Sequence, residues 1–240
     1  MLYSPAAMLD ISRIKAIGLD LDDTLWPIWP VIIRAEAQML AYLEPLAPES
    51  AAIFADPARR QALRESVVRG NPDLSHNMSV LRLESIRAAL RQSGEDVALA
   101  EAAFDVFFES RMQVQMYDDA LPALVHLAAR YPIVAVSNGN ADIHRVGIGQ
   151  HFTANMSAHI FGVGKPDVRI FHAAAQAAGV APHEVLHVGD DPALDVLGGL
   201  NAGMQTVWVN RNGQAWQHAQ QPHASVSDLT VLCELLANRS

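Results

Sequence analysis

The chain has 240 residues, half of them hydrophobic, and a formal net charge of −9. Its length predicts one large domain, or one domain with a second inserted into it. The negative charge argues against a general nucleic-acid binder, and the single cysteine excludes an intrachain disulfide and cysteine-rich metal sites.

Short apolar runs along the chain predict strands that are buried on both faces. In chain order they are "IKAIGLDL" (14–21), "PIVAVSN" (132–138), "EVLHVGD" (184–190) and "MQTVWVN" (204–210), with "AHIF" (158–161) as a shorter candidate. Helical patterns lie between them, at "DALPALVHLAARY", "VRIFHAAAQAAGV" and "ALDVLGGLNAG". Strands that alternate with helices predict an α/β fold, an open parallel Rossmann-like sheet with helices on both faces.

The stretch from Pro27 to Met116 breaks this alternation. Its segments are helical in period and no convincing strand occurs among them: "RAEAQMLAYLEPLA", the run 57–69, "MSVLRLESIRAALRQSG" and "DVALAEAAFDVFFESRMQVQM". We therefore expect a core domain made of residues 1–26 and 117–240, with an all-helical cap domain inserted at 27–116.

Polar residues occur where the predicted strands end. In chain order they are Asp20 and Asp22, "SNGN" (137–140), Lys165 in "GVGKPD", "GDD" (189–191) and Asp195. Taken singly, each has a simpler explanation as a helix cap, a turn or a solvated lysine. Ligands of open α/β sheets bind at the carboxyl ends of the strands, so the joint placement of these residues predicts one site.

These residues carry a resemblance to a known family. "DLDDT" fits the DxDxT motif of the haloacid dehalogenase superfamily of phosphohydrolases, and Ser137, Lys165 and "GDDPALD" fit its second, third and fourth motifs. The four motifs run in the right order, and the helical insertion resembles the helical cap of that family. The chain thus resembles a phosphatase of this superfamily with a helical cap.

The resemblance implies hydrolysis of phosphate monoesters through an aspartyl-phosphate intermediate. Asp20 would attack phosphorus, and Asp22 would protonate the leaving oxygen and then deprotonate the hydrolytic water. Ser137 and the backbone N–H of Asn138 would bind phosphoryl oxygens, and Lys165 would stabilise negative charge.

The resemblance also implies a Mg²⁺ ion, held by the carboxylates of Asp20 and Asp190 and by the backbone carbonyl of Asp22. Asp195 would then hold metal-bound water or orient Lys165. The charges agree with a metal, because crowded carboxylates need a cation or a proton to coexist. Mg²⁺ prefers oxygen ligands, and together with Lys165 it would balance the three aspartates before a phosphate dianion arrives.

Two features in the sequence are given no catalytic role. "HEVLH" (183–187) matches the HExxH zinc pattern, but that pattern requires a helix and this segment predicts a strand. Four strand residues would place the two histidines roughly 13 Å apart, so we interpret the match as accidental. Asp23 stands at the variable position of the DxDxT motif, and we expect it to cap a helix at most.

Similarity extends beyond the motifs. The segments "YSP…ISRIKAIGLDLDDTLW", "VSNGNADI" and "LHVGDDPALDVLGGLNAGMQTVWVN" look like those of proteobacterial phosphatases of this superfamily that act on flavin mononucleotide (FMN) and on 5-amino-6-(5-phospho-D-ribitylamino)uracil. We therefore expect a flavin or ribityl-pyrimidine phosphate as substrate, in riboflavin and FMN metabolism. Asp22 argues against dehalogenation, because dehalogenases of the superfamily lack the second aspartate.

Other functions stay open at this point. A sugar-phosphate phosphatase, a nucleotide phosphatase or a phosphomutase would have the same fold. A protein of another class, which binds phosphate or regulates without turnover, would also have it. The complete set of Asp20, Asp22, Lys165 and Asp190 weighs against a protein without turnover.

The cap offers candidate substrate contacts, each with a structural alternative. Trp26 and Trp29 stand where the chain enters the insertion, and either could stack on a flavin or pyrimidine ring or pack the cap against the core. In "NPDLSHNMS" (71–79), His76 and Asn77 could hydrogen-bond a ribityl chain or ring, or cap the helix that begins near Ser79.

The expected partner is a small-molecule phosphate ester, with no nucleic acid and no membrane. No apolar stretch is long enough to span a bilayer, and the N-terminal residues lack the pattern of a signal peptide. We expect a cytoplasmic protein that is a monomer or a weak dimer.

Overall fold

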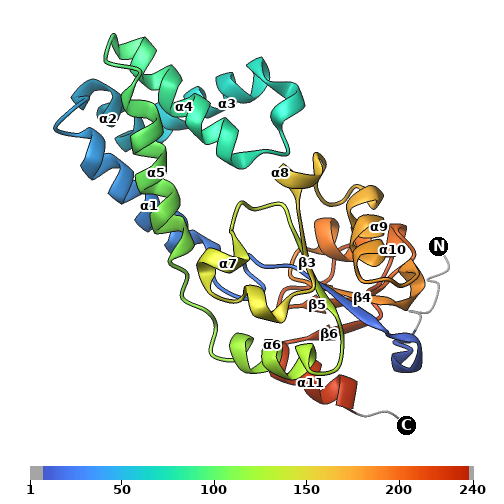
Figure 1. Ribbon diagram of the computed structural model, residues 1–240. Helices are drawn as coiled ribbons and strands as arrows, with labels where there is room; N and C mark the ends of the chain where they lie inside the picture. The colour runs from blue at the N-terminus through green and yellow to red at the C-terminus, as the bar shows by residue number, and fades with distance from the viewer. Residues whose placement is uncertain (1–7, 238–240) are drawn as a thin grey trace. The chain divides into compact units, whose positions relative to one another are not determined.

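The computed structural model describes residues 8–237, which form two compact units (Figure 1). The core unit comprises the described residues up to Pro27, Met116–Gly139 and those from Ile143 onward, and the cap unit comprises Ile28–Gln115 and Asn140–Asp142. These junctions lie one residue from the expected boundaries, apart from the short segment Asn140–Asp142. The "YSP" part of the lead-in lies outside the described residues.

The core unit is built on six strands, all parallel, in the order β3-β2-β1-β4-β5-β6. The strands are β1 (Ala16–Leu19), β2 (Ile133–Ser137), β3 (Ala154–Ser157), β4 (Val185–Gly189), β5 (Gln205–Val209) and β6 (Ala224–Val226). Every residue of β1, β2, β4 and β5 is buried, because the sheet is covered on both faces. The predicted open parallel α/β sheet is confirmed.

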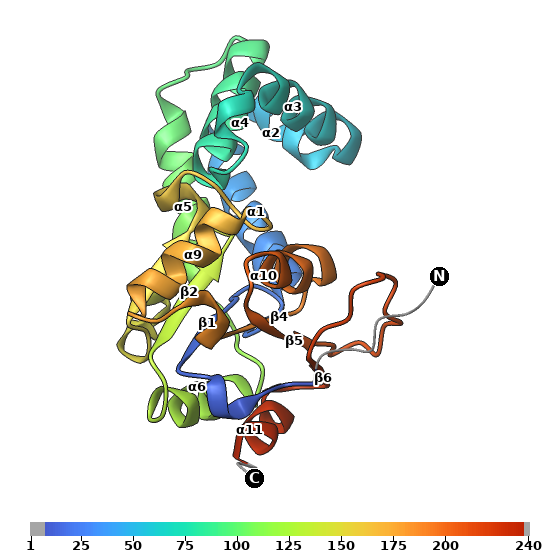
Figure 2. The same ribbon diagram turned by 90° about the vertical axis from the view of Figure 1, so that its right-hand side faces the viewer.

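Helices cover both faces of this sheet (Figures 1 and 2). One face carries α9 (Val168–Ala177) and α10 (Gly198–Asn201), and the other carries α6 (Ala120–Ala128) and α11 (Leu229–Ala237). The short elements of the unit are η1 (Ile11–Arg13), α7 (Ile143–Val146), η3 (Gly149–His151), α8 (Ala158–Phe161), η4 (Pro182–Glu184) and the π-helical turn η5 (Pro192–Leu197). Among the described residues, no helix has the length and hydropathy needed to cross a membrane.

The cap unit is helical, as the periodicity predicts. Its elements are α1 (Ile28–Leu43), α2 (Pro48–Ala55), α3 (Pro57–Gly70), η2 (Pro72–Leu74), α4 (Met78–Ser93) and α5 (Leu99–Met112). They enclose an apolar core that includes Met39, Leu43, Phe54, Ile86 and Phe107. Local signals set the helix ends: the Asp56 side chain caps the N-terminus of α3, and Gly94 ends α4 in the left-handed region at φ 70°.

Two strands differ from the prediction. "AHIF" forms the helix α8, and the strand is the preceding segment "ANMS" (β3). The second difference is β6, which the sequence pattern did not predict. Both lie at the outer ends of the sheet and keep partly exposed residues, so neither has the continuous apolar run that marks the central strands.

Candidate active site

Three neighbouring strands bring the predicted catalytic residues to one edge of the sheet. β1 lies between β2 and β4 and runs parallel to both. Asp20 follows β1, Ser137 ends β2, and Asp190 follows β4. Because parallel strands end at the same edge, the topology places these residues next to one another, as the sequence pattern predicts.

Lys165 is buried between two carboxylates. Its Nζ lies 2.5 Å from Asp20 Oδ1 and 2.6 Å from Asp195 Oδ1. Burial alone would lower the pKa of the ammonium group, but the charges of Asp195 and Asp20 outweigh it and raise that pKa above the usual lysine value. Lys165 is therefore a fixed cation beside the predicted nucleophile.

Asp195 holds this lysine in place. Burial alone would raise the pKa of Asp195, but the Lys165 ammonium and a hydrogen bond from His187 outweigh it and hold that pKa at about 2. Its Oδ2 accepts the backbone N–H of Asp191 at 3.1 Å. A Cβ at residue 189 would come within 2.2 Å of Asp195 Cγ, so glycine is required there. Asp195 is expected either to hold metal-bound water or to orient Lys165, and the ion pair favours the second role.

Asp20 and Asp190 are joined by a threonine. The buried Thr24 hydroxyl lies 3.0 Å from Asp20 Oδ2 and 3.2 Å from Asp190 Oδ1, so it donates to this pair of oxygens. The indole N–H of Trp208, on β5, donates to the backbone carbonyl of Asp190 at 2.7 Å. These hydrogen bonds, together with the ion pair between Lys165 and Asp20, fix the segments that carry Asp20 and Asp190.

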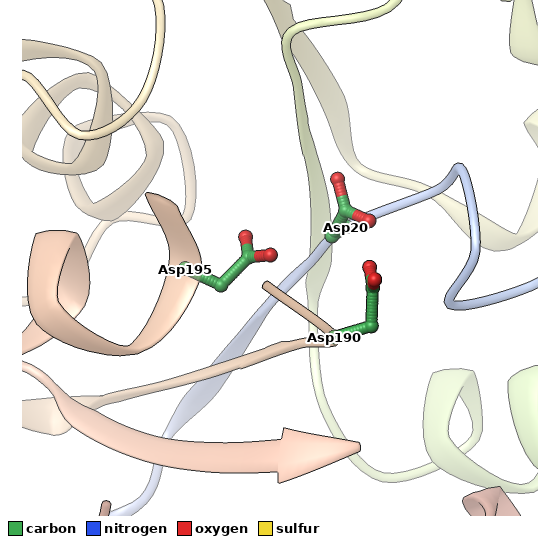
Figure 3. Close-up of side chains that lie close together, drawn as sticks. All are labelled: Asp20, Asp190 and Asp195. Atoms are coloured by element: carbon green, nitrogen blue, oxygen red, sulfur yellow. The ribbon is translucent and has the colours of Figure 1, made fainter. Parts of the chain in front are cut away.

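The carboxylates of Asp20, Asp190 and Asp195 converge on one space, with oxygens within 4.8 Å of one another (Figure 3). Burial raises the pKa of Asp20 well above its ordinary value, and the neighbouring carboxylates add to this although Lys165 opposes it. Burial, with the charges of Asp195 and Asp23, raises the pKa of Asp190 to about 7. The cluster thus carries more negative charge than Lys165 balances.

This donor set fits a hard divalent cation. All the available groups are oxygens, which Mg²⁺ prefers, and a cation here would stabilise the buried carboxylates in their charged form and relieve their mutual repulsion. Asp20 and Asp190 are the residues that would hold it. Both oxygens of Asp195 are already engaged, by Lys165, His187 and the Asp191 N–H.

Asp22 is oriented by Trp26. The indole N–H of Trp26 donates to Asp22 Oδ1 at 2.7 Å, and the two residues form a parallel bridge across a short turn. Asp22 Oδ2 lies against the Ser137 loop, where a Cβ at Gly139 would come within 2.2 Å of it. Trp26 is 0% exposed. Trp26 therefore orients Asp22, and stacking of its ring on a ligand stays a prediction.

Asp23 forms the turn between Asp22 and Trp26. It adopts φ 61°, in the left-handed region that aspartate tolerates better than most residues. Its N–H donates to the Trp26 carbonyl at 2.7 Å. The next helix, α1, begins only at Ile28, so a helix-capping role for Asp23 stays a prediction.

The predicted phosphate-binding residues lie on the loop after β2. Ser137 is buried, and its Oγ accepts the N–H of Gly139 at 3.0 Å. The Asn138 side chain brackets the backbone of Lys165, donating to its carbonyl at 2.8 Å and accepting its N–H at 2.7 Å. Asn138 therefore also positions the lysine loop, in which the Lys165–Pro166 peptide is cis.

The cap candidates belong to the other unit. Asn77 caps α4, because its side chain accepts the N–H of Val80 at 3.1 Å. The capping alternative for Asn77 is thus confirmed. Trp29 is 69% exposed, and His76 is half-buried. Contact of either residue with a substrate stays a prediction.

Sequence reasoning missed three contributors to the site: Thr24, Trp208 and His187. His187 lies in β4, and its Nε2 is 2.9 Å from Asp195 Oδ1, whereas His183 lies in η4. The "HEVLH" segment is therefore not a helix with two histidines on one face, in agreement with the sequence interpretation. A signal was present, since a histidine inside a buried apolar strand needs a polar partner.

Comparisons with known proteins find relatives over most of the chain. Residues 14–203 match the family described as haloacid dehalogenase-like hydrolase. The 5-amino-6-(5-phospho-D-ribitylamino)uracil phosphatase YigB of Escherichia coli K12 is 33% identical over 94% of this chain and 98% of its own. A phosphoserine phosphatase of Thermus thermophilus is 30% identical over 90% of this chain and 96% of its own.

A solved structure is also similar over most of the chain. It is described as a 2-haloacid dehalogenase from Pseudomonas syringae pv. Tomato DC3000 and superposes with a TM-score of 0.89. The two sequences are 35% identical, and the match covers 95% of this chain and 100% of the other. The relatives therefore carry two different activities in their names, phosphate-ester hydrolysis and dehalogenation.

Proposed function

Because the chain belongs to the haloacid dehalogenase-like hydrolases, we propose that it hydrolyses phosphate monoesters with Mg²⁺ through a phosphorylated Asp20. Support comes from Asp20 and Asp190 at the ends of β1 and β4, from Lys165 paired with Asp20, and from phosphatases among the relatives. The competing activity is dehalogenation, which the name of one similar structure states for that protein.

The observation that carries the proposal is the Asp22 carboxylate, oriented by Trp26 and placed against Gly139 of the phosphate-binding loop. A halide leaves as a stable anion and needs no proton. The alkoxide of a phosphate ester is a strong base, and a positioned acid that protonates it lowers the barrier. A second carboxylate beside the nucleophile is therefore useful for ester cleavage and unnecessary for dehalogenation.

The first step transfers the phosphoryl group to the enzyme. A carboxylate oxygen of Asp20 attacks phosphorus while Asp22 gives its proton to the departing ester oxygen. Ser137 and the loop after β2 hold phosphoryl oxygens, and the Lys165 ammonium faces the charge that develops next to Asp20. A Mg²⁺ ion held by Asp20 and Asp190 would supply further positive charge to the phosphoryl oxygens.

The second step regenerates the nucleophile. Asp22, now ionised, takes a proton from water, and the water oxygen attacks the phosphorus of the aspartyl-phosphate. The bond between phosphorus and Asp20 breaks, which releases inorganic phosphate and restores the carboxylate. Asp22 therefore acts as acid and then as base, which requires that its side chain stay in one place through both steps.

For the substrate, we propose a flavin or ribityl-pyrimidine phosphate of riboflavin metabolism. The proposal is supported by similarity over nearly the whole chain to the E. coli relative named for a ribitylaminouracil phosphate. Sugar phosphates and nucleotides are the alternatives within the same reaction. A phosphomutase would use the same first step, but it would pass the phosphoryl group to a second hydroxyl instead of to water.

A substrate panel tests the proposal. Purified protein with Mg²⁺ is assayed for phosphate release from 5-amino-6-(5-phospho-D-ribitylamino)uracil, FMN, a nucleoside monophosphate and a sugar phosphate, and for halide release from a 2-haloacid. We expect phosphate release, highest kcat/KM on the ribityl esters, and no halide. Halide release without phosphate release would contradict the reaction, and a clear preference for a sugar phosphate would contradict only the substrate class.

A further inference from the structure

A histidine that the proposed mechanism does not use lies beneath the active site. His187, in the middle of β4, is 1% exposed. Phe171 meets its ring edge-on, with 4.9 Å between ring centroids. A Cβ at Gly18, on β1, would come within 2.9 Å of His187 Nδ1, and one at Gly199 within 3.4 Å of its Cβ. The glycine at position 18 therefore makes room for the imidazole ring, whereas 3.4 Å is an ordinary contact distance.

Within the described part of the chain, only one nitrogen of this ring has a polar partner. Nε2 lies 2.9 Å from Asp195 Oδ1, whereas Nδ1 is buried and no described residue hydrogen-bonds to it. Asp195 also accepts from Lys165 and from the Asp191 N–H, so its carboxylate is the acceptor and Nε2 carries the proton. The ring is neutral, because a charged ring would bury a second, unpaired N–H at Nδ1.

This hydrogen bond completes the set of contacts around Asp195. Oδ1 receives Lys165 Nζ and His187 Nε2, and Oδ2 receives the Asp191 N–H. The lysine is a long, flexible side chain that depends on Asp195 for its own position. Of the two donors to Oδ1, the imidazole is the one held by a strand. Without it the carboxylate can rotate, and the ammonium group can move away from Asp20.

Stability alone does not explain this residue. A buried ring nitrogen without a partner among the described residues costs free energy that an aliphatic side chain of similar volume would not. Val185 stands two residues earlier in β4, on the same face of the sheet, and is also buried, so an aliphatic residue suits this face of the strand. The histidine is explained instead by what its Nε2–H does to Asp195.

We propose that His187 is a positioning residue, whose Nε2–H fixes the Asp195 carboxylate so that Lys165 stays against the nucleophile Asp20. The inference rests on the proposed function for its catalytic consequence. The hydrogen bond and the tautomer are properties of the fold, and they can be measured in a protein without substrate.

Two variants separate the hydrogen bond from packing. His187→Gln keeps a donor nitrogen at a similar distance along the side chain, and His187→Leu fills the space without a donor. We expect His187→Leu to lower kcat about 10- to 100-fold, the range typical of residues that orient an active-site group, with KM little changed. His187→Gln should restore most of the lost kcat. His223→Leu is the matched control, because His223 is half-buried and bonds to the backbone of Thr206 instead of to Asp195.

Urea unfolding measures the stability of each variant, and so tests whether the loss of kcat comes only from a less stable fold. We expect His187→Leu to be at least as stable as His187→Gln while being much less active. If kcat falls equally in both variants, or if activity follows stability across the set, the positioning role is wrong.

Nitrogen-15 NMR of histidine-labelled protein tests the tautomer directly. The His187 signals, identified by their loss in His187→Gln, should show a neutral ring with the proton on Nε2. A proton on Nδ1 or a charged ring at neutral pH would overturn the inference. If the wild-type protein shows no phosphatase activity while the Nε2–H tautomer is found, the proposed function fails and the hydrogen bond to Asp195 stands.

Discussion

The two lysines of this chain allow a direct measurement of what the buried cation contributes. Lys165 is 3% exposed and contacts Asp20 and Asp195, whereas Lys15 is 62% exposed and pairs with Glu184 at 2.5 Å. Lys165→Met removes the charge and keeps most of the length of the side chain. It leaves two carboxylates in a buried site without their counter-charge, and the same substitution at Lys15 leaves Glu184 near water.

The expected costs differ accordingly. Breaking a buried ion pair by removing one partner costs about 3–5 kcal/mol of unfolding free energy, whereas exposed pairs contribute about 0–1 kcal/mol. For a chain of this size, 1 kcal/mol corresponds to about 2–4 °C in Tm, so Lys165→Met should lower Tm by roughly 6–20 °C. Lys15→Met should change Tm by no more than about 4 °C.

The loss of unfolding free energy in Lys165→Met should also depend on pH. Without Lys165, the pKa of Asp20, which is already raised, rises further, and the pKa of Asp195 rises above its value in the unfolded chain. Groups with raised folded pKa values bind protons more tightly in the folded state, so the variant is favoured at low pH and loses stability as pH rises. Urea unfolding, followed by circular dichroism at about pH 5 and about pH 8, should therefore show a larger difference from wild type at the higher pH.

A double-mutant cycle with Asp195→Asn identifies the partner. We expect the double variant to be destabilised by less than the sum of the two single variants, because the asparagine no longer needs a counter-charge. A destabilisation below about 1 kcal/mol for Lys165→Met, or one that is the same at both pH values, would refute the assignment of Lys165 as a buried, paired cation.

Three further predictions follow from other contacts. Trp26→Phe keeps an aromatic ring and removes the 2.7 Å hydrogen bond to Asp22. The kcat should fall more for an alkyl phosphate, whose leaving group needs the acid, than for p-nitrophenyl phosphate. Equal losses of kcat on the two substrates would assign Trp26 to packing alone. Burial alone would raise the pKa of Asp119, but hydrogen bonds from Arg211 and Leu229 outweigh it and lower that pKa. Ionised Asp119 therefore stabilises the fold at pH values above its ordinary pKa of about 3.9, and this stabilisation is lost as pH falls through the lowered pKa. Asp119→Asn should therefore reduce Tm at about pH 7 and have little effect near pH 2, and an equal reduction at both pH values would contradict this reasoning. EDTA should abolish turnover and excess Mg²⁺ should restore it, with little rescue by Ca²⁺, whose larger radius suits this chemistry poorly; rescue by Zn²⁺ alone would contradict the oxygen donor set.

The central strands and their end residues were predictable because each depends on a short local pattern. β1, β2, β4 and β5 are mostly apolar and fully buried, since helices cover both faces of the sheet. The outer strands β3 and β6 are partly exposed, and their sequences do not differ from loops in a recognisable way. Parallel topology then brought Asp20, Ser137 and Asp190 together without further information.

The residues that orient the site were harder to predict, because their partners are distant in the chain. Thr24 contacts Asp190 across 166 positions, and the indole of Trp208 was indistinguishable in the sequence from any buried aromatic ring. Trp26 shows the same difficulty at short range. The hydrogen bond between Trp26 and Asp22 spans a turn in which Asp23 is in the left-handed region, and the spacing of four residues does not by itself predict this turn.

The central claim, that Asp20 becomes phosphorylated, is tested most directly by trapping the intermediate. Asp22→Asn removes the base that activates water but leaves Asp20 able to attack a substrate with a good leaving group, such as p-nitrophenyl phosphate. After mixing with this substrate and Mg²⁺ and quenching in acid, mass spectrometry should find one phosphoryl group on the peptide that contains Asp20, and none in Asp20→Asn, which should be inactive. Phosphate release by Asp20→Asn at a rate near wild type, or turnover by Asp22→Asn without any phosphorylated Asp20, would contradict the account.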